Sequence, residues 1–87
     1  MTRQQRYKET HPWVRYVEYA RRRCSDASSR WWPFYGARGI RCTLNAEQLR
    51  EIWFRDKAYA LKKPSLDRID SNGNYELSNV RFIEQAQ

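Results

Sequence analysis

The chain has 87 residues and a formal charge of +7, from 17 Lys and Arg against 10 Asp and Glu. This length predicts one small domain, and contents of 40% hydrophobic and 15% aromatic residues exclude a disordered tail. The sequence lacks the run of ~18 apolar residues that a membrane span requires, and its N-terminal residues lead into no apolar stretch. We therefore expect neither a membrane-spanning segment nor a signal peptide.

The cysteine and histidine content limits the chemistry further. Cys24 and Cys42 are too few for a disulfide scaffold, and together with His11 they do not supply the four ligands of a structural zinc site. We therefore expect no zinc, and reduced thiols in a cytoplasmic protein.

The positive charge is concentrated in the first half of the chain. Residues 1–42 contain ten basic residues, nine of them Arg, and three acidic residues, whereas residues 43–87 contain seven of each sign. Aromatic residues alternate with these arginines, and this composition is typical of a nucleic-acid-binding surface. A solubilising face over an aromatic core would have the same composition. The candidate nucleic-acid-binding residues are Arg15, Arg21, Arg22, Arg23, Arg30, Arg38, Arg41, Trp31 and Trp32, with Arg81 from the last quarter.

Residues 1–10 are polar, and we expect a flexible N-terminal segment there. A basic helix is expected next, within the segment 11–42, because apolar residues recur at the helical spacings of four, three and four. The pair His11-Pro12 suits its first turn, and three consecutive arginines in its last turn complement the helix dipole. The apolar face of this helix consists of Trp13, Val17, Ala20 and Cys24.

Residues 31–39, with the sequence WWPFYGARG, predict an aromatic loop after the basic helix. The glycines at 36 and 39 indicate positive φ or a close approach of the backbone. Few other large residues are available for the core, so we expect at least one of Trp31 and Trp32 to pack against Trp13 and Trp53. Stacking of the two loop tryptophans on bases is the alternative.

A second helix is expected from about Ala46 to Leu61, within the segment 45–62. Asn45 can cap this helix, and Gln48 can complete a capping box. The proline in Lys62-Lys63-Pro64 predicts its end. Its apolar residues lie near one face: Leu49, Ile52, Trp53 and Ala60.

The last quarter, residues 65–87, has a different pattern. Ser65–Asp70 and Val80–Ile83 are expected to be short strands, and the Asn72-Gly73 pair between them is a strong hairpin-turn signal. Residues 84–87 look like the first residues of a final helix.

The sequence SLDRIDSNGNYELSNVRF at 65–82 resembles the ββα-metal core of HNH endonucleases, also called the His-Me finger. The chain is similar, more narrowly, to small phage and bacterial HNH-like proteins with an Arg-Cys pair, a YGGRGI loop and an SLDRID strand. Arg23-Cys24 and YGARGI at 35–40 occur here in that order. The resemblance implies a small single α+β domain, with two helices and an aromatic loop packed on a C-terminal ββα-metal-like hairpin whose final helix is truncated.

HNH enzymes hydrolyse a phosphodiester with one divalent metal, and the resemblance assigns roles to three residues. Asp67 is the metal ligand for Mg²⁺ or another divalent ion, and Asn79 is the asparagine that braces the active-site loop. Arg68 occupies the general-base position, where an arginine remains protonated and cannot accept a proton from water. It could bind a phosphate instead. The second metal ligand would fall at or beyond Gln87. Asp70 is expected on the strand face opposite Asp67, and both carboxylates could simply pair with Arg68, Arg81 or the turn backbone.

Three functions remain open from the sequence. The first is DNA binding through the Arg-rich half, with cleavage weak or absent because Arg68 replaces the general base; binding and chemistry would then occupy separate halves of the chain. The second is a Mg²⁺-dependent nicking endonuclease. The third is a phage protein that binds and inhibits a host or defence protein. DNA is the leading partner, a membrane is not expected, the oligomeric state is open, and the expected location is the cytoplasm of a bacterial cell.

Overall fold

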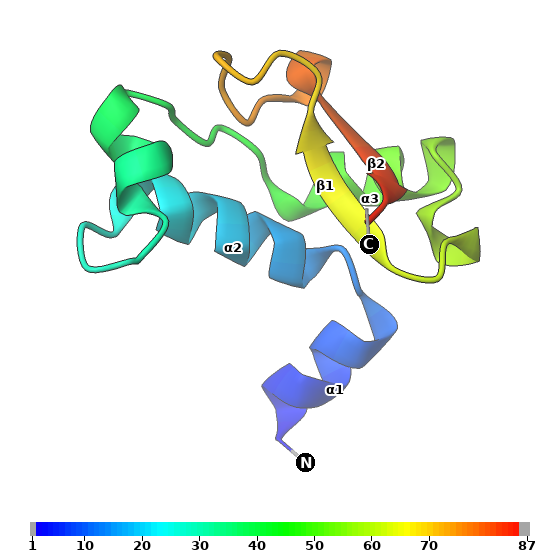
Figure 1. Ribbon diagram of the computed structural model, residues 1–87. Coiled ribbons are helices and arrows are strands. Elements are labelled where there is room, and N and C mark those ends of the chain that lie inside the picture. The colour runs from blue at the N-terminus through cyan, green and yellow to red at the C-terminus, as the bar shows by residue number, and fades with distance from the viewer. Residues whose placement is uncertain (1, 86–87) are drawn as a thin grey trace.

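The computed structural model describes residues 2–85 of the chain. Three α-helices, α1 (Arg3–Thr10), α2 (Val14–Ser25) and α3 (Ala46–Arg55), precede the strands β1 (Pro64–Arg68) and β2 (Val80–Glu84) in this range. Figure 1 shows α2, α3 and the sheet grouped together, with α1 projecting from the body. The Cα radius of gyration is 13.0 Å. The protein is therefore a small compact α+β domain, as expected at that level of description. Single 3-10 turns lie between these elements: η1 (Trp32–Phe34), η2 (Gly36–Arg38), η3 (Ala58–Ala60) and η4 (Leu77–Asn79).

Helix α2 forms where the apolar spacing predicts a helix. Val17 and Ala20 are buried on its inner face, and Trp13 is buried just before its first residue. Arg22 and Arg23 lie in the last turn, where their charge complements the carbonyl end of the helix dipole.

Helix α3 has the predicted start but not the predicted end. The Asn45 side chain accepts the Gln48 N–H at 2.8 Å, and the Gln48 side chain accepts the Asn45 N–H at 3.1 Å, which confirms the capping box. The helix ends at Arg55 rather than near Leu61, because Lys57 adopts a left-handed conformation with φ 53°. That turn brings Ala58 into the core in place of Ala60, which is exposed.

Strands β1 and β2 form a two-stranded antiparallel sheet in which Leu66 faces Phe82 and Asp67 faces Arg81. Successive residues of a strand point to opposite faces, so the first pair lies on the core side and the second on the outer side. Phe82 is buried and Arg81 is exposed, in agreement with this alternation.

One aromatic cluster joins the sheet to both helices. The ring of Phe82 lies 5.1 Å from Tyr16 of α2 and 5.2 Å from Trp53 of α3, so the two helices cover the same sheet face. Neither Trp31 nor Trp32 belongs to the core, so the expectation that one of them fills it is wrong. The core consists of Trp13, Val17, Ala20, Ile40, Leu44, Leu49, Ile52, Trp53, Ala58, Tyr75, Val80 and Phe82.

The connection between the strands, residues 69–79, is longer than the expected tight hairpin at Asn72-Gly73. A turn forms at its start, where the Gly73 N–H donates to the Asp70 carbonyl at 3.0 Å. Tyr75 then pairs with the segment after the aromatic loop: its N–H donates to the Arg41 carbonyl and its carbonyl accepts the Thr43 N–H, both at 2.9 Å. These bonds hold the β1–β2 loop against the middle of the chain.

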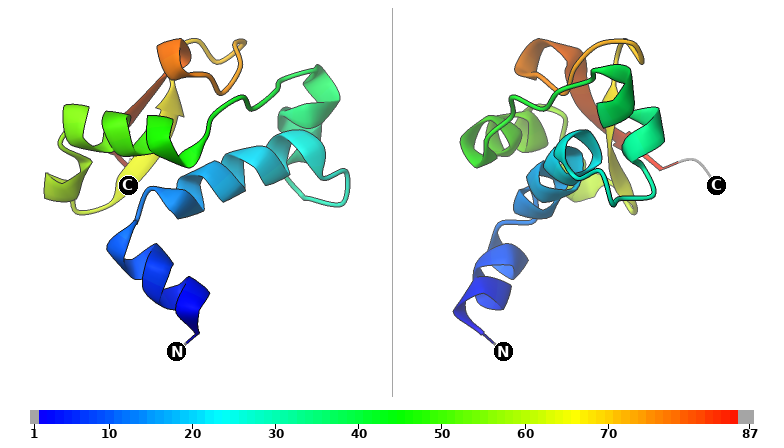
Figure 2. Two further views of the ribbon diagram at one scale, coloured as in Figure 1. Left: turned by 180° about the vertical axis from the view of Figure 1, so that it is seen from behind. Right: turned by 90° about the vertical axis from the view of Figure 1, so that its left-hand side faces the viewer.

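Residues 3–10 form helix α1, although we expected a flexible segment there. Thr2 and Gln5 form a capping box at its start. An ion pair between Lys8 and Glu18, with N–O 3.0 Å, joins α1 to α2. Figure 2 shows that α1 otherwise stands away from the sheet and α3.

The expected final helix does not begin at Glu84. Glu84 is the last residue of β2 and faces Pro64, and its carboxylate accepts the N–H groups of Lys62 and Lys63 at 2.9 and 2.6 Å. Residues 86 and 87, which belong to the same prediction, lie outside the described residues. No helix in the described range is long and apolar enough to cross a membrane.

Candidate nucleic-acid interface

The C-terminal end of α2 carries three consecutive arginines with different surroundings. Arg22 is exposed. Arg21 donates from Nη2 to the Leu44 carbonyl at 3.1 Å, and Arg23 donates from Nη1 to the Tyr75 hydroxyl at 3.2 Å. Each of the latter two therefore uses one guanidinium nitrogen to hold the fold.

Guanidinium groups and aromatic rings alternate from the end of α2 to the β1–β2 loop. The Arg23 guanidinium carbon lies 5.2 Å from the ring centre of Trp31 and 5.4 Å from that of Tyr35. The Arg68 guanidinium carbon lies 4.8 Å from Tyr35 and 5.3 Å from Tyr75, and these two tyrosine rings stack at 5.8 Å. Arg30 lies over the Trp31 ring at 4.9 Å. We call this set the cation–π ladder: Arg30, Trp31, Arg23, Tyr35, Arg68 and Tyr75.

The charge of the cation–π ladder is not balanced by acidic side chains. The salt bridges among the described residues are Lys8–Glu18, Arg55–Asp56 and Arg81–Asp67, none of which involves a ladder residue. Aromatic faces stabilise a guanidinium by only about 0.5–1 kcal/mol at exposed sites and leave its positive charge in place. The end of α2 and the aromatic loop thus present positive charge that an external anion can neutralise.

The two loop tryptophans differ in exposure and role. Trp31 is 40% exposed and remains a candidate for base stacking. Trp32 is partly buried, and its ring lies so close to Gly36 that a methyl group at that position would overlap it. Gly36 is therefore required for this close approach, whereas Gly39, at φ 83°, supplies a left-handed turn.

Arg38 connects the aromatic loop to the β1–β2 loop. It donates from Nη1 to the Phe34 carbonyl at 3.1 Å and from Nη2 to Oδ1 of Asn72 at 2.8 Å. Arg41 is exposed nearby and lines a depression together with Arg21.

The structure thus gathers most of the candidate arginines but not all of them. Arg15 lies apart, in a depression with Lys8 and Glu9 beside α1, and Arg81 lies on the outer face of the sheet. The arginines that lie together at the end of α2 and in the neighbouring loops are Arg21, Arg22, Arg23, Arg30, Arg38 and Arg41.

Asp67, the expected metal ligand, forms an ion pair with Arg81 on the outer face of the sheet, with Nε–Oδ2 3.0 Å. Asp70 is engaged too, because its Oδ1 accepts the Asn72 N–H at 2.9 Å. No group of three or more His, Cys, Asp or Glu side chains comes together within residues 2–85. Mg²⁺ binding at Asp67 stays a prediction.

The side chain of Arg68, at the end of β1, forms hydrogen bonds with the backbone of the β1–β2 loop. Its Nη1 donates to the carbonyl oxygens of Ser71 at 2.6 Å and Gly73 at 2.9 Å, while its guanidinium carbon lies 4.8 Å from the Tyr35 ring centre and 5.3 Å from that of Tyr75. These contacts stabilise the β1–β2 loop. A phosphate bound by Arg68 would have to use guanidinium N–H groups other than those that hold this loop.

Asn79 braces the same loop. Its Oδ1 accepts the Asp70 N–H at 2.9 Å, and its Nδ2 donates to the carbonyl oxygens of Asp70 at 3.1 Å and Asn74 at 2.9 Å. Bracing of the loop backbone is the geometry that the HNH resemblance implies for this residue. A part in catalysis stays a prediction.

Burial raises the pKa of several tyrosine and cysteine side chains in this part of the molecule. It raises the pKa of Tyr75 to about 12, although the Arg23 hydrogen bond acts in the opposite direction. Burial also raises the pKa of Cys24 to about 11, with a further increase from nearby Cys42, and it raises the pKa of Cys42 and of Tyr16 above their ordinary values. At neutral pH these groups add no negative charge to the surface.

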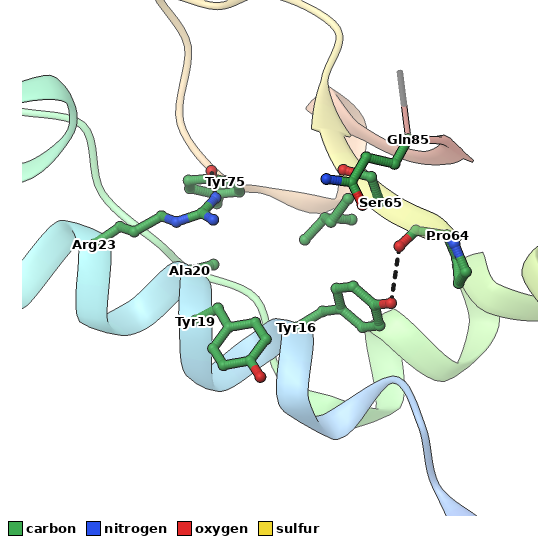
Figure 3. A pocket seen from close by; sticks show the side chains of 9 residues that line it. Tyr16, Tyr19, Ala20, Arg23, Pro64, Ser65, Tyr75 and Gln85 are labelled. Carbon is green, nitrogen blue, oxygen red and sulfur yellow. Dashed lines mark hydrogen bonds between the residues drawn. The ribbon is translucent and has the colours of Figure 1, made fainter. Parts of the chain in front are cut away.

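A pocket of about 180 Å³ lies between α2 and β1, and we call it the α2–β1 pocket. Figure 3 shows Arg23 and Tyr75 at one end and Tyr16 at the other, where the Tyr16 hydroxyl donates to the Pro64 carbonyl at 2.9 Å. The pocket is lined by Tyr16, Tyr19, Ala20, Arg23, Pro64, Ser65, Leu66, Tyr75 and Gln85.

Sequence reasoning missed the part played by Tyr75 and Tyr35. The alternation of arginine and aromatic residues indicates that the two kinds of side chain meet, but not which pairs do so. The contact of Arg23 with Tyr75 joins residues 52 positions apart, which no local pattern encodes.

Comparison with protein-family models, curated proteins and solved structures finds no match for this chain.

Proposed function

We propose that the protein is a DNA-binding HNH-like domain that contacts the phosphate backbone through the arginines at the end of α2 and in the aromatic loop. The supporting observation is their charge: they gather at one end of the molecule, and no acidic side chain of the described residues forms a salt bridge with them. Arginine pairs its planar donors with phosphate oxygens, so this surface is suited to a polyanion.

The HNH-like part of the proposal is supported by the C-terminal element. Two antiparallel strands carry Asp67 on the first strand, and Asn79 braces the loop between them. A complete ββα-metal arrangement additionally needs a helix after β2, beyond the described residues.

We further propose that cleavage is weak or absent. Arg68 cannot serve as a general base, because a guanidinium keeps its proton at neutral pH. Asp67 is paired with Arg81, and a divalent ion would have to displace that partner.

Duplex binding is tested by fluorescence anisotropy of a labelled DNA at several salt concentrations. Affinity should fall steeply with salt, because phosphate contacts release counterions. Arg22→Gln should weaken binding and lower the salt slope by about one unit, whereas Arg50→Gln, an exposed arginine on α3, should change neither. An affinity independent of salt, or equal effects of the two variants, would contradict the proposal.

Cleavage is tested separately by nicking of supercoiled plasmid with Mg²⁺ or Mn²⁺. The proposal expects nicking at or only slightly above the level of Asp67→Ala. Efficient nicking that disappears in Asp67→Ala would show an active endonuclease and would overturn the cleavage part of the proposal while leaving DNA binding in place.

A further inference from the structure

A groove runs along α2 beside the positive end of the molecule. It consists of the α2–β1 pocket and a second depression of about 270 Å³, lined by Tyr19, Arg22, Arg23, Ser29 and Trp31. Tyr19 and Arg23 line both hollows, so the two lie next to each other along α2. We call the combined feature the α2 groove.

Two properties distinguish the α2 groove from other hollows on the surface. Its lining contains two arginines and no acidic residue, and it presents aromatic rings in both halves, with Tyr19 47% and Trp31 40% exposed. Two other depressions contain a glutamate, Glu18 or Glu9, and the depression at Arg21 and Arg41 contains no aromatic ring.

Aromatic rings and arginine side chains lie side by side along the α2 groove. Tyr16 and Tyr19 meet edge to face at 6.4 Å in the inner half, Arg23 lies at the junction, and Trp31 lies in the outer half. Proteins bind single strands by combining a positive groove for the phosphates with aromatic rings on which bases stack. A duplex keeps its bases paired and stacked, so it cannot use these rings.

The size of the inner half also favours an unstacked base. A volume of about 180 Å³ is below the ~300 Å³ of a typical small-molecule pocket and suits a single ring system. The Arg23 guanidinium, the Ser65 hydroxyl and the Gln85 amide supply hydrogen-bonding groups around this pocket.

We propose that the α2 groove binds single-stranded DNA, with a base in the α2–β1 pocket beside Tyr19 and the neighbouring phosphates at Arg22 and Arg23. This inference rests on the proposed DNA-binding function and specifies the form of DNA that this surface prefers. Tyr19, at the junction of the two hollows, is the residue on which the preference most depends.

The test measures anisotropy with three labelled ligands of one length: a single strand, its duplex, and a strand with the same phosphates but abasic sugars. Wild type should bind the single strand more tightly than the other two at equal salt. Tyr19→Ala should weaken single-strand binding about tenfold, since one stacked base contributes about 1–3 kcal/mol. The same variant should change duplex and abasic-strand binding less than twofold.

Tyr59→Ala is the matched control, because Tyr59 is an exposed tyrosine (59%) on η3 and does not line the α2 groove. Equal effects of the two variants, or an undiminished Tyr19→Ala effect on the abasic strand, would overturn the inference. Duplex binding equal to single-strand binding would also overturn it while leaving the proposed function intact. Absence of binding to all three ligands would overturn both.

Discussion

Replacement of Arg68 by alanine tests whether this residue is a structural brace or a phosphate contact. The variant loses the hydrogen bonds to the carbonyl oxygens of Ser71 and Gly73, at 2.6 and 2.9 Å, and the contacts with the rings of Tyr35 and Tyr75. Ser71 is exposed, so water can replace part of this bonding. We therefore assign about 1 kcal/mol to each hydrogen bond and about 0.5 kcal/mol to each ring contact, roughly 3 kcal/mol in total.

That loss is large for a domain of this size, whose whole free energy of unfolding is on the order of 4–13 kcal/mol. Urea unfolding followed by tryptophan fluorescence measures it directly. With a slope of about 1 kcal/mol per molar urea, the midpoint should fall by about 2–3 M. Arg81→Ala is the matched control in the same sheet, because its ion pair with Asp67 is largely solvent-exposed and should contribute less than about 1 kcal/mol.

A phosphate-clamp role would give a different pattern. Arg68→Ala would then weaken DNA binding while leaving the free energy of unfolding within about 0.5 kcal/mol of wild type, the usual effect of a surface substitution. That result would refute the structural reasoning. A loss equal to that of Arg81→Ala would refute it as well.

Three further outcomes are expected. Gly36→Ala should lower the free energy of unfolding by about 1–3 kcal/mol in the same urea assay, because the added methyl group would overlap both the Trp32 ring and the Cys24 carbonyl oxygen; an unchanged midpoint would show that neither group is held against the glycine. The Arg55 hydrogen bond holds the pKa of Asp56 below its ordinary value, so the ionised Asp56 stabilises the fold above about pH 4, and this stabilisation is lost as the pH falls further. Between pH 5 and pH 3, the free energy of unfolding in urea should therefore decline less in Asp56→Asn than in wild type. With its pKa at about 11, Cys24 should react with iodoacetamide at pH 8 on the order of 100-fold more slowly in the native protein than in urea, as read by peptide mapping, and equal rates would contradict the burial of this thiol.

Local patterns predicted the elements that local forces define. The apolar spacing located α2, the side chains of Asn45 and Gln48 located the start of α3, and the two short strands formed within a residue or two of the expected positions. Helix α1 was missed because its eight residues lack an apolar face, and its capping box at Thr2 and Gln5 offers only a weak signal.

Features that depend on tertiary contact were not predictable. The left-handed turn that ends α3 occurs at Lys57, a residue without the turn preference of glycine or asparagine. The same distinction applies to the candidate site, where the sequence predicts some features and tertiary contact decides the others. Its arginines could be named from composition, but the partners of Arg23 and Arg68 come from distant segments. Arg68 of the last quarter contacts rings of the cation–π ladder, so the two halves of the chain are joined structurally, and the separation of binding from chemistry stays a prediction.

The cation–π ladder also fixes an order of events while the chain is being made. Its last ring, Tyr75, is synthesised 52 residues after Arg23, so the aromatic loop cannot acquire its final contacts until Tyr75 is available to fold. Distant contacts of this kind carry a loop-closure cost and form late in folding. The basic half therefore lacks its final packing until the β1–β2 loop has folded against it.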